Sequence, residues 1–180
     1  MAVSYYYCTT TDFGADFVRT NGGFYEAIKD GTPQPVYAGN EYIGFETSST
    51  PEVCASKSPE AALFAVIHNE KRSGVYHIYA TTHTPDVDIS TAGFDFNILE
   101  EVRYQNPDDD PIAFTRAHTV SVPHAAVEDV GNAYDDETPT IASEWAEAVK
   151  DGLATLIATG GYPEELEWDN PYAEWDQYRP

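Results

Sequence analysis

The 180-residue chain contains very little positive charge: 9 Lys and Arg stand against 31 Asp and Glu, and the formal net charge at pH 7 is -22. Proteins that bind nucleic-acid backbones without sequence preference need Lys and Arg to neutralise phosphates, so this composition argues against such a partner. No stretch approaches 18 consecutive apolar residues, so we expect no membrane-spanning helix and no membrane partner. A normal aromatic and aliphatic fraction remains, which predicts a soluble globular protein.

The acidic residues are spread over every loop of the sequence instead of gathering in one tail. We interpret this pattern as the solvated surface of a protein adapted to molar salt, where a Debye length of roughly 3 Å screens self-repulsion. The predicted source is a haloarchaeon or a virus that infects one. An acidic mimic of nucleic acid is the alternative, and it predicts charge clustered on one face.

Cysteine is scarce as well. Cys8 and Cys54 are too few for the disulfide framework of a small secreted scaffold, and both lie in apolar, strand-like contexts, so we expect two buried free thiols. The N-terminal sequence MAVSYYYCTTTDF lacks the basic and apolar regions of a secretory signal. These features predict a cytoplasmic protein, or a virion component assembled in the cytoplasm of a halophilic host.

The strong short motifs of catalysis are missing. The sequence contains no P-loop, GxGxxG, GxSxG elbow, HExxH or CxxC pair. His83, Asp86 and Asp88 carry metal-ligating groups, but acidic loops are common in such a composition, so we predict no metal cofactor.

One stretch does carry a clear local signal. Ser58 is a good N-cap and Pro59 suits the first helical position, so a helix should begin here with an apolar face that includes Phe64. The preceding residues 53–56 are typical of the end of a strand. Ser56 and Ser58 therefore lie where a strand meets a helix N-terminus, a corner that either binds a ligand or is simply a helix cap.

The remaining pattern predicts an α+β protein. We expect strands at residues 3–10, 41–45, 74–82, 101–104 and 114–122, a loop at 12–23 and short helices or extended segments elsewhere, including a helix at 24–30. In the strand at 74–82 the side chains should alternate, with Val75, His77, Tyr79 and Thr81 on one face and Tyr76, Ile78 and Ala80 on the other.

A long helix is predicted at 140–159, ended by Gly160 and Gly161, because apolar residues recur there at helical spacing: Ile141, Trp145, Val149, Leu153 and Leu156.

We divide the chain into residues 1–124, which hold the predicted sheet, and residues 125–180. The second part contains the long C-terminal helix and, from residue 162, an acidic tail rich in tyrosine and tryptophan. So much aromatic surface is unfavourable in water. We expect the tail to pack on the domain or to dock on a partner protein.

The order of these elements resembles the ADP-ribosyltransferase fold family over about residues 3–122. In its cholera-toxin-like branch, a strand ends in Ser-Thr-Ser before a helix, a YxIYV-type strand follows, and a Glu-x-Glu precedes a valine. Here Ser56-Lys57-Ser58, the strand VYHIYAT and Glu101-Val102 occupy those places. The branch of the rifampicin ADP-ribosyltransferases is similar too, since its YHGT strand and YxT…AALW segment match Tyr6-Tyr7-Cys8-Thr9, Cys54-Ala55-Ser56 and Ala61-Ala62-Leu63-Phe64.

The resemblance implies a split, mixed β-sheet core with flanking helices, and NAD as substrate without a metal. The implied reaction is mono-ADP-ribosyl transfer or NAD hydrolysis, in which a carboxylate stabilises positive charge on the ribose as the nicotinamide leaves. Glu101 is the implied catalytic residue, with Ser56 orienting it and either Phe64 or Tyr79 packing on nicotinamide. The full set of implied site residues is Glu101 and Glu100 for catalysis, and Tyr7, Thr9, Cys54, Ser56, Ser58, Phe64 and Tyr79 for NAD.

The chain also departs from the family pattern. Tyr7 stands where the two branches have Arg or His, and Leu99 reduces the Glu-x-Glu to Glu100-Glu101, of which one can face a pocket. Arg19, in the loop expected after the first strand, either replaces the missing cation or is a solvent-exposed arginine. Glu101 in turn is either catalytic or an exposed strand residue paired with Arg103 or Arg116.

These departures leave a second function open. A descendant of the fold that has lost catalysis would serve as a structural or interaction protein, for example in the particle of a haloarchaeal virus. Its aromatic C-terminal tail would be the docking element.

Overall fold

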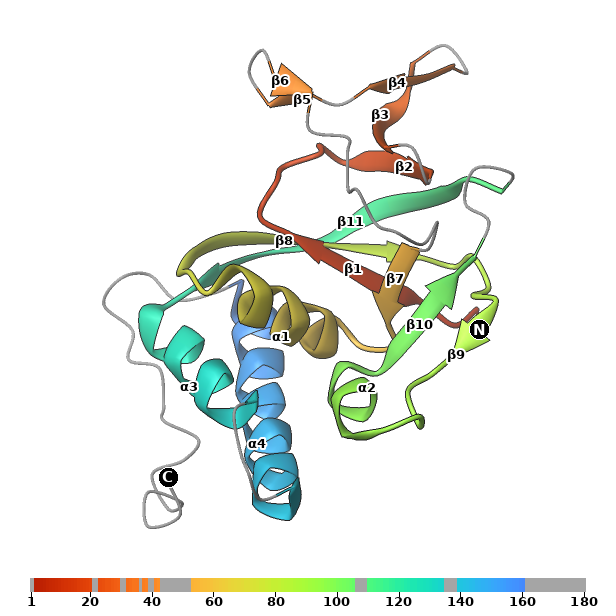
Figure 1. The fold of residues 1–180 in the computed structure, drawn as a ribbon. Coiled ribbons are helices and arrows are strands. Elements are labelled where there is room, and N and C mark those ends of the chain that lie inside the picture. Colours follow the sequence, from red (N-terminus) through yellow and green to blue (C-terminus); the bar gives the residue numbers. More distant parts are fainter. Residues whose placement is uncertain are drawn as a thin grey trace.

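The computed structural model describes residues 2–20, 23–29, 32–35, 37–38, 41–42, 53–105, 110–134 and 139–160. Within them the chain forms the expected α+β fold, in which a large sheet carries helices on one face (Figure 1). The sheet order is β4-β3-β2-β11-β8-β1-β7-β10-β9. Its strands are β1 (Tyr5–Thr9), β2 (Asp16–Thr20), β3 (Gly23–Lys29), β4 (Thr32–Pro35), β7 (Val53–Ser56), β8 (Gly74–Thr81), β9 (Val87–Asp88), β10 (Glu101–Tyr104) and β11 (Ile112–Val122). A separate small sheet pairs β5 (Tyr37–Ala38) with β6 (Glu41–Tyr42).

The sheet is antiparallel at every pairing among the described residues, where we expected a mixed sheet. The reason lies in the position of β1. Helix α1 (Pro59–Glu70) connects β7 to β8, which run parallel to each other, but β1 lies between these strands and is antiparallel to both.

Helix α1 begins as the sequence predicts. Ser58 is its N-cap, and the Ser58 hydroxyl accepts a hydrogen bond of 3.3 Å from the backbone N–H of Ala61. Pro59 occupies the first turn. The predicted C-terminal helix is α4 (Pro139–Thr159), and Gly160, with φ 76°, follows its end. Two further helices, α2 (Phe94–Leu99) and α3 (His124–Tyr134), were not predicted.

Two predictions near the N-terminus are wrong. The expected loop at residues 12–23 contains β2, and the expected helix at 24–30 is the strand β3. Tertiary pairing decides both, because β2 pairs with β11 on one side and with β3 on the other. Phe17 and Val18 of β2 are buried in this arrangement, and β3 takes the extended conformation that its pairing with β2 requires.

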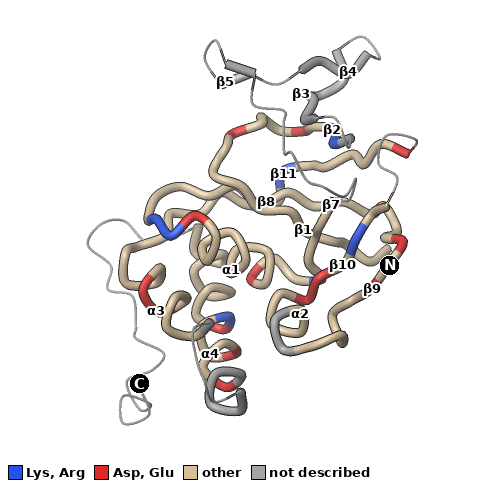
Figure 2. The backbone as a smooth tube through the Cα atoms, viewed as in Figure 1, with Lys and Arg blue, Asp and Glu red and all other residues tan. Residues whose placement is uncertain are grey.

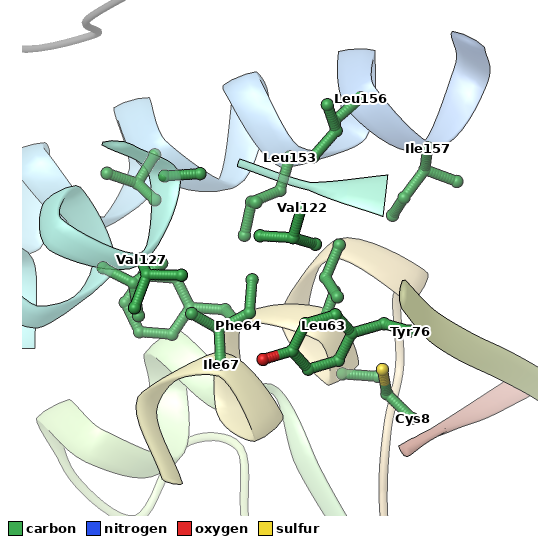
Figure 3. Close-up of a cluster of buried hydrophobic side chains, with 14 of the residues drawn as sticks. Cys8, Leu63, Phe64, Ile67, Tyr76, Val122, Val127, Leu153, Leu156 and Ile157 are labelled. Atoms are coloured by element: carbon green, nitrogen blue, oxygen red, sulfur yellow. The ribbon is translucent and has the colours of Figure 1, made fainter. Parts of the chain in front are cut away.

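The main core lies between the sheet and helices α1, α3 and α4 (Figure 3). Phe64 is fully buried there, which stabilises the fold by about 1.5–3 kcal/mol relative to an exposed side chain. The apolar face predicted for the C-terminal helix is also buried in this core, as Trp145, Val149, Leu153 and Leu156 show. The side chain of Ile141, predicted on the same face, lies outside the described residues.

A second, aromatic cluster lies on the opposite face of the sheet. The rings of Phe17 and Phe114 stack with their centroids 5.1 Å apart, and the rings of Phe17 and Tyr79 are nearly perpendicular with their centroids 4.7 Å apart. Tyr7 packs against this cluster at 5.7 Å from Phe114. The alternation predicted for the strand at 74–82 is confirmed, since Tyr76 and Ile78 face the helices and Tyr79 faces the aromatic cluster.

The C-terminal helices share one core with the sheet. Helix α3 begins at His124, close to the predicted boundary, but α3 and α4 pack against each other and against α1. Residues 161–180, the aromatic tail, lie outside the described residues. Asp and Glu occur on helices, strands and loops of the described part (Figure 2), and none of its helices has the length and apolarity needed to cross a bilayer.

Candidate functional site

A cavity of about 530 Å³ lies between strands β1, β7 and β10 and helix α1. Its wall combines polar and charged groups on the strands with both apolar and polar groups on helix α1, where Asn69 and Glu70 follow Ala62, Ala65 and Val66. The lining residues are Tyr6, Tyr7, Cys8 and Thr9 of β1, Arg19 of β2, Cys54, Ala55 and Ser56 of β7, Ala62, Ala65, Val66, Asn69 and Glu70 of α1, Leu99 of α2, and Glu101 of β10.

The cavity is located where the sheet opens. Strand β1 pairs with β8 at five positions but with β7 at a single described position, Tyr6 opposite Ser56. Beyond that pair, β1 and β7 both line the cavity, while β7 pairs along its whole length with β10. The strands therefore separate after Tyr6, and the backbone edges that face the opening become part of the wall.

The corner of Ser56, Lys57 and Ser58 contributes one side chain to this wall. Ser56 is buried, lines the cavity and lies opposite Glu101 on β10. Ser58 instead caps α1 and does not line the cavity. Lys57 turns to strand β9, where its Nζ is 2.6 Å from Asp88 and 2.8 Å from the Ser90 hydroxyl.

Glu101 lies at the cavity with its side chain 13% exposed. The Nε of Arg103 donates a hydrogen bond of 2.8 Å to Oε1 of Glu101, and the Cys54 thiol shares a second hydrogen bond with the carboxylate. The sequence left open whether Glu101 is an exposed residue paired with an arginine. It is paired with Arg103, but it is largely enclosed and faces the cavity.

The neighbouring Glu100 has a different environment. Its backbone follows α2 in the left-handed region, with φ 49°, and its carboxylate accepts a 2.9 Å hydrogen bond from Lys150 of α4. Lys150 is 4% exposed. Glu100 does not line the cavity, so the structure brings one of the two adjacent glutamates to it.

Arg19 is a cavity residue, although the sequence placed it in a loop. It lies in β2, opposite Ile112 of β11, and it is 5% exposed. Its guanidinium carbon lies 4.8 Å from the centroid of the Tyr7 ring. In the sequence, Asn21-Gly22 is a dipeptide typical of tight hairpins, a signal that would have predicted strands β2 and β3 on either side of it.

The two aromatic residues proposed to pack on nicotinamide do not line the cavity. Phe64 faces the helical core. The hydroxyl of Tyr79 donates a hydrogen bond to the carbonyl of Gly14, and the N–H of Phe13 donates one to it in turn. The aromatic rings at the cavity are Tyr6 and Tyr7.

The two cysteines also differ from each other. Cys8 is buried, as expected, and its burial raises its thiol pKa well above the ordinary value. The expectation of a buried thiol is wrong for Cys54, which is exposed on the face of β7 that Ser56 shares, while Val53 and Ala55 pack in the aromatic cluster. Of the nine site residues implied by the resemblance, Tyr7, Thr9, Cys54, Ser56 and Glu101 meet at the cavity.

Comparisons of this chain with family models, with curated proteins and with solved structures give no match.

Proposed function

We propose that the cavity binds NAD and that the protein cleaves the nicotinamide–ribose bond, transferring ADP-ribose to a protein acceptor or to water. The observation that carries this proposal is the meeting of Glu101, a largely enclosed carboxylate, with Arg19, a largely buried cation, at one cavity. Its volume of about 530 Å³ falls within the roughly 300–1,000 Å³ typical of small-molecule sites.

The chemistry assigns different roles to the two charges. When the bond between C1′ and the nicotinamide nitrogen breaks, the electron pair leaves with neutral nicotinamide, and positive charge develops on the ribose. A carboxylate near the ribose stabilises that charge, which is the role of Glu101. A nucleophile then adds its oxygen or nitrogen to C1′ and releases its proton. Arg19 carries the charge suited to the pyrophosphate of the same ligand.

The remaining polar groups fit an orienting role. Ser56 lies opposite Glu101 in the register of β7 and β10, so its hydroxyl can bind either the carboxylate or the ribose. Tyr6 and Tyr7 replace Phe64 and Tyr79 as the aromatic rings available to a nicotinamide. The part of α1 that presents Ala62, Ala65 and Val66 to the cavity is apolar and suits a flat ring.

A second candidate is a binding or structural protein that retains the fold without catalysis. The contact between Arg103 and Glu101 favours it, because an arginine that permanently occupies the carboxylate leaves less of it for a ligand. The two candidates differ in NAD binding, because a purely structural protein is not expected to bind NAD in this cavity.

The test is release of nicotinamide from NAD labelled in the nicotinamide ring, at molar salt. We expect release by the wild-type protein and a loss of about 100-fold or more in Glu101→Gln, since removing one transition-state charge has effects of that order. Glu144→Gln makes the same change on the exposed side of α4 and should release nicotinamide like the wild type. No release by the wild-type protein would contradict the enzyme proposal.

A further inference from the structure

The carboxylate of Glu101 has two hydrogen-bonding neighbours on adjacent strands. Arg103 lies two residues further along β10, and its Nε is 2.8 Å from Oε1 of Glu101. Cys54 lies opposite Arg103 on β7, and its thiol bonds to the same carboxylate. A guanidinium is only a donor and a thiol donates S–H, so both contacts direct hydrogens at Glu101.

The arginine is itself held in place. Its guanidinium carbon lies 5.7 Å from the centroid of the Phe96 ring on α2. An ionised carboxylate offers about four acceptor positions, so the bonds from Arg103 and Cys54 leave others for a ligand hydroxyl in the cavity. A side chain fixed by neighbours before the ligand arrives meets it in a defined orientation.

We propose that Arg103 and Cys54 are positioning residues that hold the carboxylate of Glu101 in one orientation at the cavity wall. The catalytic consequence of this arrangement rests on the proposed function. The hydrogen bonds of Arg103 and Cys54 to Glu101 do not depend on that function, and they can be tested without NAD.

The Cys54 thiol reports on the arrangement. The cavity wall partly screens the Cys54 thiol from water, and this desolvation, followed by the charge and the hydrogen bond of Glu101, raises the pKa of Cys54 to about 12, whereas the charges of Arg103 and Arg19 lower it. Alkylation needs the thiolate, whose fraction changes about tenfold per unit of pKa. Removing the negative and the positive neighbour should therefore move the alkylation rate in opposite directions.

The first experiment measures iodoacetamide labelling of Cys54 at about pH 8.5, with peptide mapping to separate it from Cys8. Glu101→Gln should label about threefold faster or more, Arg103→Met should label more slowly, and Glu144→Gln should match the wild type. Arg103→Lys keeps a positive charge, so its Cys54 labelling rate should lie closer to that of the wild type. This variant replaces Arg103→Met in the comparison if Arg103→Met does not fold. A Cys54 rate in Glu101→Gln within about twofold of the wild type would overturn the inference.

The second experiment measures nicotinamide release. Cys54→Ala and Arg103→Met should lower kcat about tenfold with little change in KM, as expected for loss of an interaction that matters in the transition state, and Cys54→Ser should restore part of the rate because it keeps a donor. Unchanged kcat in Cys54→Ala and Arg103→Met would overturn the positioning role. If the wild type releases no nicotinamide but the labelling rates move as expected, the proposed function fails while the positioning of Glu101 is supported.

Discussion

The guanidinium of Arg19 on β2 lies over the ring of Tyr7 on β1, with its carbon 4.8 Å from the ring centroid. This contact joins two strands that are not neighbours, since β11 and β8 lie between them in the sheet order. It also directs one of the few cations of an acidic chain to the cavity wall. A buried cation that lines a cavity is well suited to an anionic ligand.

Replacing Arg19 should therefore weaken NAD binding. We expect Arg19→Gln to raise the Kd by about 10- to 100-fold, because a charge-assisted hydrogen bond contributes about 1.5–3 kcal/mol. Calorimetric titration at molar salt measures the change. Lys71→Gln removes an exposed cation that does not line the cavity and should bind NAD like the wild type. Equal affinities of Arg19→Gln and the wild type would show that the cation is structural.

The adjacent residues Glu100 and Glu101 should differ in how much stability each loses on substitution by Gln. Glu100→Gln removes the closest partner of the buried Lys150 and should lower the free energy of unfolding by about 1–3 kcal/mol, with Glu147, at 3.5 Å, limiting the loss. Glu101→Gln should cost less than about 1 kcal/mol, since its partner Arg103 is 31% exposed in its side chain. Denaturant unfolding of both variants decides this, and a larger loss for Glu101→Gln would reverse the assigned roles.

The Ser58 N-cap of α1 should contribute to the stability of the fold. Ser58→Ala removes the side-chain acceptor for the Ala61 N–H and should lower the free energy of unfolding by about 1 kcal/mol. Ser58→Asp keeps an acceptor and should retain most of the stability. If both variants unfold at the wild-type denaturant concentration, the cap does not contribute.

The contact between Lys57 and Asp88 should affect how the free energy of unfolding falls at low pH. Hydrogen bonds from Lys57, and then from Ser90, lower the pKa of Asp88 from 3.8 to about 2. The unfolded chain therefore binds a proton at higher pH than the folded one, so this stabilisation is present above about pH 3.8 and is lost as the pH falls through about 2. Asp88→Asn should show a shallower decline of stability between these values, and an unchanged slope would contradict the assignment.

The sequence was sufficient for elements whose signals are local. The cap at Ser58, the alternation around Tyr76 and Tyr79 and the helical spacing of Trp145 and Leu153 each depend on neighbouring residues, and the structure confirms them. Helix α3 had a comparable signal, since Ala126, Val130 and Ala133 recur at helical spacing and are buried.

The positions of the cavity residues depended on contacts between elements that are distant in the sequence. Arg19 reaches the cavity because β2 pairs with β11, about 95 residues further along the chain, which no local pattern specifies. The position of Phe64 in the core instead of at the cavity follows from helices α3 and α4 covering α1. Five implied site residues lie on the cavity wall because β1, β7 and β10 are adjacent in the sheet, and this adjacency is a property of the whole fold.

If Arg19 and Glu101 bind the same NAD molecule, a crystal structure of Glu101→Gln at saturating NAD in molar salt should show both contacts. We expect a dinucleotide between β1 and β7, with its nicotinamide ribose in hydrogen-bond contact with residue 101 and its pyrophosphate beside Arg19. NAD bound elsewhere, or a cavity without ligand at a concentration that saturates binding in solution, would contradict it.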